Sequence, residues 1–362
     1  MALLTRRKWL SRAARWIGSF AVAGSVPVFA SDPTTGLTDN KMMKQKTGDL
    51  PATRHSILDL IGNTSLLELR NIVPSDHARI LLKLESENPT GSMKDRMALA
   101  MIEAAEQDGR LKPGGRVVEY TGGSTGVSLA FVCSVKGYPV DLVTSDAFSI
   151  DKRNHMAAFG AELTLVKSDH GGMDEALTRN MIEAARRIRE ERGGFWTDQL
   201  KNADVLSRYH DMGEEIWQQA EGKVDAFVQG VGTGGSLRGV AERLIEHNPD
   251  AHIVAVEPSE SAVLSGGEQG AHKIEGIGAG FVVPLWKPGI VGEIATVSTG
   301  ESQAMARRLA REEGVFAGTS TGGNLVAALR TAKELGPGRT VVTLMVDSGM
   351  KYLSTALYED VN

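Results

Sequence analysis

The chain has 362 residues, enough for about two domains, and hydrophobic residues make up 41% of it. A formal net charge of -5 shows no basic excess, which argues against nucleic acid as a partner. The single cysteine, Cys133, excludes an intramolecular disulfide. It lies in the apolar run "VSLAFVCSV", where we expect a buried helical residue.

The first 30 residues have the features of an export signal. Arg6 and Arg7 precede an apolar stretch of about fifteen residues that ends in Val28-Phe29-Ala30. This stretch is too short to span a bilayer comfortably, and its last residues suit signal peptidase, so we expect a cleaved signal and no stable membrane anchor. The paired arginines resemble a twin-arginine signal and predict a periplasmic or otherwise exported protein. If translation begins near Met42 instead, the protein stays in the cytoplasm.

Residues 31–55 are polar and rich in Thr, Asp and Lys, so we expect a linker there. Beyond them, strand-type apolar runs alternate with amphipathic helical runs, the pattern of a parallel α/β sheet. Several of the strands are apolar throughout, as strands buried on both faces should be. The expected strands are 79–86, 116–121, 140–145, 161–167, 225–231, 252–258 and 340–346, and the expected helices are 97–107, 126–136, 152–160, 177–191, 239–247, 303–313 and 325–335.

One lysine, Lys94, stands at the start of a helical run, in the stretch "NPTGSMKDR" at residues 88–96. The partial positive charge of a helix N-terminus disfavours a second positive charge, so it lowers the pKa of a lysine there. A neutral amine in this place can form a Schiff base. The alternative is a lysine that reaches from the helix start to solvent.

Three glycine-rich turns each follow a strand and open a helix: "YTGGSTG" at 120–126, "GVGTGGS" at 230–236 and "AGTSTGG" at 317–323. Turns of this kind present backbone N–H groups to an anion at a helix N-terminus. Together they indicate a ligand with anionic groups.

The second turn also matches the dinucleotide-binding fingerprint, through Gly230, Gly232 and Gly235, with Glu257 placed to hold a ribose. A nicotinamide or flavin oxidoreductase is therefore an alternative. It leaves Lys94 and the other two turns without a role.

A serine hydrolase is a second alternative, because Gly-x-Ser-x-Gly occurs around Ser124 and around Ser320. No histidine follows Ser320, and Ser124 lacks an upstream His-Gly-Gly segment. The eight histidines show no metal-ligand spacing, so no metal site is expected.

Five motifs occur in the order found in the cysteine synthase (O-acetylserine sulfhydrylase) and cystathionine β-synthase family, which the chain resembles from about Ile57 to Tyr358. They are "NPTGSMKDR", "TGGSTG", "GVGTGGS", "HKIEGIGAGF" and "DSGMKYLSTALY". The resemblance implies a pyridoxal-phosphate enzyme of fold type II, similar to the tryptophan synthase β chain. It implies two αβα domains with the cofactor in the cleft between them. The smaller would be 88–202 and the larger 56–87 with 203–362. Family members are commonly homodimers.

The resemblance also implies roles for single residues. Lys94 resembles the lysine that forms the Schiff base with the cofactor, and Ser348 resembles the hydroxyl that binds the pyridine nitrogen. A neutral hydroxyl there moderates the ring as an electron sink, which suits β-elimination chemistry. The residues implied for the cofactor are Lys94, Ser124, Gly232, Thr233, Gly234, Gly235, Ser236 and Ser348. Those implied for the amino acid substrate are Thr121, Gly122, Gly123, Ser124, Thr125, Gln199 and Gly276.

The resemblance predicts β-replacement on a serine-derived amino acid, giving cysteine from O-acetylserine and sulfide. Alternatives are β-elimination, as in a cysteine desulfhydrase, a cystathionine synthase-like replacement with a thiol, and a degenerate homologue that only binds amino acids. The loop "TGGSTG" departs from the family's usual Thr-Ser-Gly-Asn-Thr-Gly at Gly122 and Ser124. We expect the loop to gain room and to bind O-acetylserine weakly, or to prefer a bulkier serine derivative.

Overall fold

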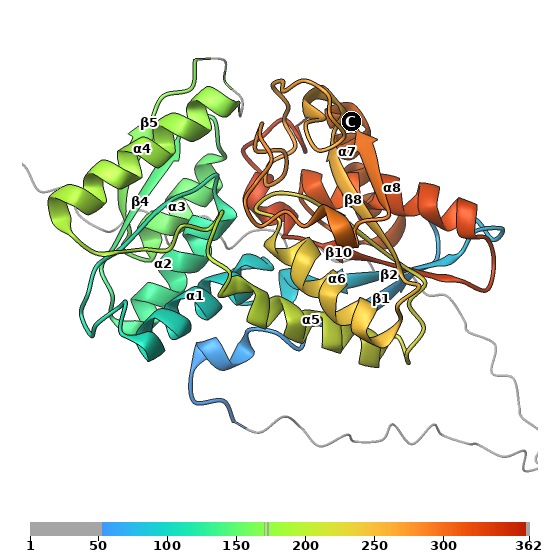
Figure 1. Ribbon diagram of the computed structural model, residues 1–362. Helices are drawn as coiled ribbons and strands as arrows, with labels where there is room; N and C mark the ends of the chain where they lie inside the picture. Colours follow the sequence, from blue (N-terminus) through green and yellow to red (C-terminus); the bar gives the residue numbers. More distant parts are fainter. Residues whose placement is uncertain (1–52, 170, 172–173, 360–362) are drawn as a thin grey trace, which may run out of the picture. The chain divides into compact units, whose positions relative to one another are not determined.

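The computed structural model describes residues 53–359, apart from 170 and 172–173 (Figure 1). Its strands are β1 (Leu66–Leu69), β2 (Arg79–Leu84), β3 (Val117–Tyr120), β4 (Val140–Ser145), β5 (Glu162–Val166), β6 (Phe195–Trp196), β7 (Ala226–Gly230), β8 (His252–Pro258), β9 (Glu293–Val297) and β10 (Thr340–Met345). Its α-helices are α1 (Lys94–Asp108), α2 (Ser124–Lys136), α3 (Ile150–Ala158), α4 (Glu175–Arg192), α5 (Val205–Gln219), α6 (Gly235–His247), α7 (Thr299–Arg308) and α8 (Thr319–Leu335).

The strands form two sheets, a six-stranded one in the order β1-β2-β10-β7-β8-β9 and a four-stranded one in the order β5-β4-β3-β6. All neighbours are parallel except β1 and β2, which are antiparallel. Every residue of β7 and of β10 is buried, which confirms the expectation of strands covered on both faces. Figure 1 shows the smaller sheet in green with α2, α3 and α4 around it. The predicted α/β fold class is confirmed.

The strands of the smaller sheet lie between residues 117 and 196, and those of the larger sheet come before and after them. The assignment of 88–202 to one domain and of the flanking segments to another stays a prediction. The expected export signal lies outside the described residues. Within the described part of the chain, no helix is long and apolar enough to cross a membrane.

Several helices begin earlier than the sequence pattern predicts. Helix α1 begins at Lys94 rather than 97, α2 at Ser124 rather than 126, and α6 at Gly235 rather than 239. In α2 and α6, residues of the glycine-rich turns themselves form the first helical turn. The N–H groups of these turns therefore belong to helix N-termini, where they favour anions.

The sequence pattern missed β1, β6, β9 and α5. Strand β6 has only two residues, and β9 alternates weakly because most of it is half-buried. Helix α5 has a regular apolar stripe at Val205, Tyr209, Met212 and Ile216, which the sequence analysis did not use, and it also contains Gly213, a poor helix former. A side chain there would meet Arg243 Cβ on α6 at 2.8 Å, so the glycine permits close packing of α5 on α6.

Candidate active site

Lys94 is the first residue of α1, and its side chain lines a pocket of about 80 Å³. The residue is 8% exposed, and its amine has no hydrogen-bond partner among the residues that the structure describes. Burial lowers the pKa of the amine to about 8, with the nearby charge of Asp347 opposing the change and Lys152 adding to it. The sequence predicted this direction from the helix N-terminus, but burial is the largest cause.

The glycine-rich turn at 230–236 borders the same pocket as Lys94, with Gly232 and Thr233 among the lining residues. A Cβ at Gly232 would lie 2.1 Å from the carbonyl oxygen of Gly276, so only glycine fits there. Within the described ranges, the N–H groups of Gly234 and Ser236 have no acceptor. Unpaired N–H groups at the start of α6 fit a phosphate group.

The turn at 120–126 forms a second wall, and Gly122, Gly123, Ser124 and Thr125 line the pocket. Thr121 lies beneath it, where its hydroxyl accepts the N–H groups of Gly123 and Gly126, both at 2.9 Å. This arrangement makes Thr121 a support for the loop, and its contact with substrate stays a prediction.

The room that the sequence predicts beside Gly122 is filled by another side chain. A Cβ at Gly122 would meet ring carbons of Phe148 at 3.2 and 3.3 Å, and Phe148 is buried. The expected gain in space is therefore wrong, because the aromatic ring compensates for the missing side chain.

Ser124 donates a hydrogen bond of 2.8 Å to Asp347, which the sequence reasoning missed. The hydroxyl of Tyr352 donates to the same carboxylate at 3.0 Å. Asp347 is buried and lines the pocket, although within the described part of the chain it has no ion-pair partner within 4.0 Å. Its place beside Ser348 in the "DSGMKY" motif was the signal that could have found it.

Gln199 also lines the pocket, and a second missed residue positions it. Glu119 is buried at the end of β3 and accepts hydrogen bonds from the Gln199 N–H at 2.9 Å and from the Thr197 hydroxyl at 2.5 Å. Burial raises the pKa of Glu119 to about 7. Gln199 in turn donates to the carbonyl oxygen of Tyr120 at 2.7 Å. A carboxyl in an otherwise apolar strand is the sequence signal for this arrangement.

A part-buried ion pair completes the wall near Gly276. Lys152 contacts Glu275 at 2.7 Å, and its ammonium lies 4.0 Å from the ring centroid of Tyr352. A Cβ at Gly123, where φ is 135°, would lie 2.3 Å from Lys152 Cδ. The conformation of the substrate loop and the position of Lys152 are therefore linked.

The structure gathers most of the predicted site residues around one pocket. Those that line it are Lys94, Gly122, Gly123, Ser124, Thr125, Gln199, Gly232, Thr233 and Gly276, and those that do not are Thr121, Gly234, Gly235, Ser236 and Ser348. Ser348 directly follows Asp347, and its hydroxyl accepts the N–H of Met350 at 3.3 Å.

The geometry does not favour the alternatives. Among the described residues, no histidine is bonded to Ser124 or Ser320 and no group of three metal-ligating side chains occurs. Glu257, the residue expected for a ribose, accepts instead from Leu264 and Ser265 of its own chain, at 2.7 and 3.0 Å.

A buried amine with a lowered pKa, at the same pocket as a glycine-rich helix start, suits an enzyme that holds an aldehyde cofactor with a phosphate group. Residues 57–347 match the family described as "Pyridoxal-phosphate dependent enzyme", and the chain belongs to it. The predicted cofactor, pyridoxal 5'-phosphate, is thereby confirmed.

The comparisons narrow the class further. A cysteine synthase of Staphylococcus aureus strain Mu50 is 45% identical over 306 residues, which cover 84% of this chain and 96% of that protein. The solved cysteine synthase from Entamoeba histolytica is 38% identical with a TM-score of 0.80, covering 88% of this chain and 95% of that one. A solved O-ureido-L-serine synthase is 35% identical with a TM-score of 0.81, and the match covers 86% of this chain and 96% of that one. The predicted family is confirmed, and so is its fold type II.

Proposed function

We propose that the protein makes cysteine from O-acetylserine and sulfide by pyridoxal-phosphate-dependent β-replacement. The similarity to cysteine synthases over most of the chain supports this reaction. The single observation that carries the proposal is the Lys94 amine, which is buried, has a pKa lowered to about 8, and faces a turn suited to a phosphate.

Pyridoxal phosphate, when bound, supplies an electron-withdrawing ring next to Cα of the amino acid joined to it. Lys94 would hold the cofactor covalently, and the turn from Gly232 to Ser236 would hold its phosphate. The hydroxyl of Ser348 is the candidate partner of the ring nitrogen. The family to which the chain belongs supports these roles, and the place of Lys94, Gly232 and Thr233 at one pocket agrees with them.

The substrate carboxylate would be bound by the loop from Gly122 to Thr125, with Gln199 on the other side. Loop N–H groups at the start of α2 suit an anion. Asp347 holds Ser124 through its hydroxyl, and Glu119 holds Gln199 through its N–H. The two carboxylates thus support the two sides of the substrate site from behind.

Lys94 is the group that would move the proton. Once the substrate amine has taken the place of Lys94 on the cofactor, the free Lys94 amine would accept the proton from Cα of the substrate. The Cβ–O bond then breaks, and its electrons leave with acetate. Sulfide then forms the bond to Cβ, and Lys94 returns the proton to Cα. With a pKa of about 8, roughly a tenth to a fifth of the amine is neutral between about pH 7 and 7.4, far more than for an ordinary lysine, and this neutral form can act as the base.

Product analysis tests the proposal. Purified protein is incubated with pyridoxal phosphate, O-acetylserine and sulfide, and cysteine and acetate are measured over time. We expect equal amounts of both products. Pyruvate and ammonia in place of cysteine would show that elimination is the native reaction.

We further propose that the active protein is a homodimer exported through its first 30 residues. Family members are commonly dimers, and Arg6-Arg7 before an apolar run resembles a twin-arginine signal. Light scattering on the purified protein tests the first point. Fractionation of native cells with N-terminal sequencing tests the second, and protein found only in the cytoplasm would contradict it.

A further inference from the structure

The segment 272–278 lies against the glycine-rich turn that is proposed to hold the cofactor phosphate. The Gly278 N–H donates to the carbonyl oxygen of Val231, at the start of that turn, at 3.0 Å. A Cβ at Gly232 would lie 2.1 Å from the carbonyl oxygen of Gly276, so the two backbones are in close contact there. Gly276 also lines the active-site pocket. The shape of this segment therefore supports one side of the phosphate turn.

The imidazole of His272 closes the segment into a loop. Its Nε2 lies 2.9 Å from the carbonyl oxygen of Gly278, and its Nδ1 accepts the Ile274 N–H at 3.2 Å. His272 is only 5% exposed. A Cβ at Gly278, where φ is 67°, would lie 2.6 Å from Nε2, so glycine permits the close approach of the ring. The loop is therefore wrapped closely round the imidazole.

Only the neutral imidazole satisfies both hydrogen bonds. A carbonyl oxygen accepts and a backbone N–H donates, so Nε2 of His272 carries a proton and Nδ1 carries none. A second proton on Nδ1 would face the Ile274 N–H across 3.2 Å, with one donor against another. Protonation of His272 therefore breaks the contact with Ile274 and loosens the loop.

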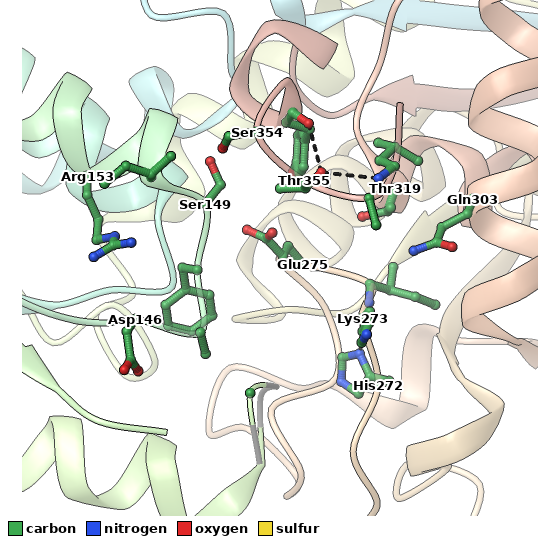
Figure 2. A pocket seen from close by; sticks show the side chains of 18 residues that line it. Asp146, Ser149, Arg153, His272, Lys273, Glu275, Gln303, Thr319, Ser354 and Thr355 are labelled. Carbon is green, nitrogen blue, oxygen red and sulfur yellow. Dashed lines mark hydrogen bonds between the residues drawn. The ribbon is translucent and has the colours of Figure 1, made fainter. Parts of the chain in front are cut away.

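Burial favours the same neutral form. It lowers the pKa of His272 from the usual 6.5, whereas the hydrogen bond to the Gly278 carbonyl and the charge of Glu260 oppose the change. Figure 2 shows His272 on one side of a cavity of about 410 Å³ and Arg153 on the other. The charged residues that line this cavity with His272 are Asp146, Arg153, Lys273 and Glu275. The imidazole is therefore neutral near neutral pH and becomes charged as the pH falls.

We propose that His272 is a positioning residue for the cofactor, whose neutral imidazole shapes the segment 272–278 so that this segment supports the phosphate turn. It acts through Gly276 and Gly278. Protonation of the imidazole at acid pH releases this support and weakens cofactor binding. The inference rests on the proposed function only where the turn from Gly232 to Ser236 holds the phosphate, and it is independent of the reaction that follows.

The pH dependence of cofactor binding tests this role. Holoenzyme is dialysed to equilibrium against pyridoxal phosphate at about pH 8 and about pH 5.5, and the dissociation constant is measured for wild type, His272→Gln and His252→Gln. Glutamine can form both hydrogen bonds of the neutral imidazole but does not titrate. His252, the first residue of β8, bonds to Glu293 instead and provides the control.

Between these two pH values, wild type and the control should lose affinity at least about threefold more than His272→Gln, because one further proton must leave them when the cofactor binds. The titrations of the cofactor phosphate and of Lys94 are common to the three proteins and cancel in this comparison. An equal loss of affinity in all three proteins would overturn the proposal.

A truncated side chain shows where the effect lies. His272→Ala removes both hydrogen bonds, so the affinity for pyridoxal phosphate at about pH 8 should fall about tenfold, with a smaller loss for pyridoxal, which has no phosphate. An equal loss for the two ligands, or none for either, would overturn the positioning role. If the wild type binds the cofactor with the expected pH dependence but forms no cysteine, the proposed reaction is wrong and the role of His272 stands.

Discussion

A side chain placed at Gly122 should disturb the active site through Phe148. The backbone of Gly122 does not have a positive φ, so it admits other residues. The space is tight, because the new Cβ would meet the ring of Phe148 at 3.2 and 3.3 Å, so this ring would have to move aside slightly. Overpacking of a buried site costs about 1–3 kcal/mol, so Gly122→Ser should lower the free energy of unfolding by about that amount. Phe148→Leu alone should cost about 1–2 kcal/mol through lost burial.

The double variant should recover part of both losses, because the smaller leucine leaves room for the serine. We expect a coupling energy of about 1–2 kcal/mol between the two positions. The assay is urea unfolding of the holoenzyme in all four members of the cycle, with kcat/KM for O-acetylserine measured in parallel. Losses that add within about 0.5 kcal/mol would refute the reasoning that Phe148 compensates for Gly122.

Two other predictions concern the cofactor. Asp347→Asn removes the negative charge that raises the pKa of Lys94, so the pH midpoint for uptake of pyridoxal phosphate by the apoprotein should fall below about 8. A midpoint that stays in place or rises, in a pH series followed by absorbance, would contradict this. Gly232→Ala drives a Cβ to 2.1 Å from the carbonyl oxygen of Gly276, so the affinity for the cofactor should fall at least tenfold in equilibrium dialysis. Gly300→Ala, where no neighbour lies within 4 Å and φ is not positive, is the control and should keep the affinity.

The sequence predicted the elements whose pattern is local. The apolar strands of the sheet cores and the glycine-rich turns before α2 and α6 follow from runs of a few residues. Lys94 was recognisable because its helix start and its motif lie within one short stretch. Helix α5 was missed although Val205, Tyr209, Met212 and Ile216 have helical spacing, and only the packing of α5 on α6 explains its Gly213.

The missed site residues depend on contacts between distant segments. Ser124 and Asp347 are 223 residues apart, and Lys152 and Glu275 are 123 apart. No pattern within a strand or helix reports such pairs. The error at Gly122 has the same origin, since the ring that fills its space belongs to a separate segment.

The covalent attachment of the cofactor tests the central claim most directly. The purified holoenzyme is reduced with borohydride and digested, and the lysine that carries the pyridoxyl group is identified by mass spectrometry. We predict that the label is on Lys94. Lys152 lines the same pocket, and Lys351 is a buried amine whose pKa burial lowers to about 8. A label on Lys152 or Lys351, or no label at all, would contradict the assignment of Lys94 as the cofactor lysine.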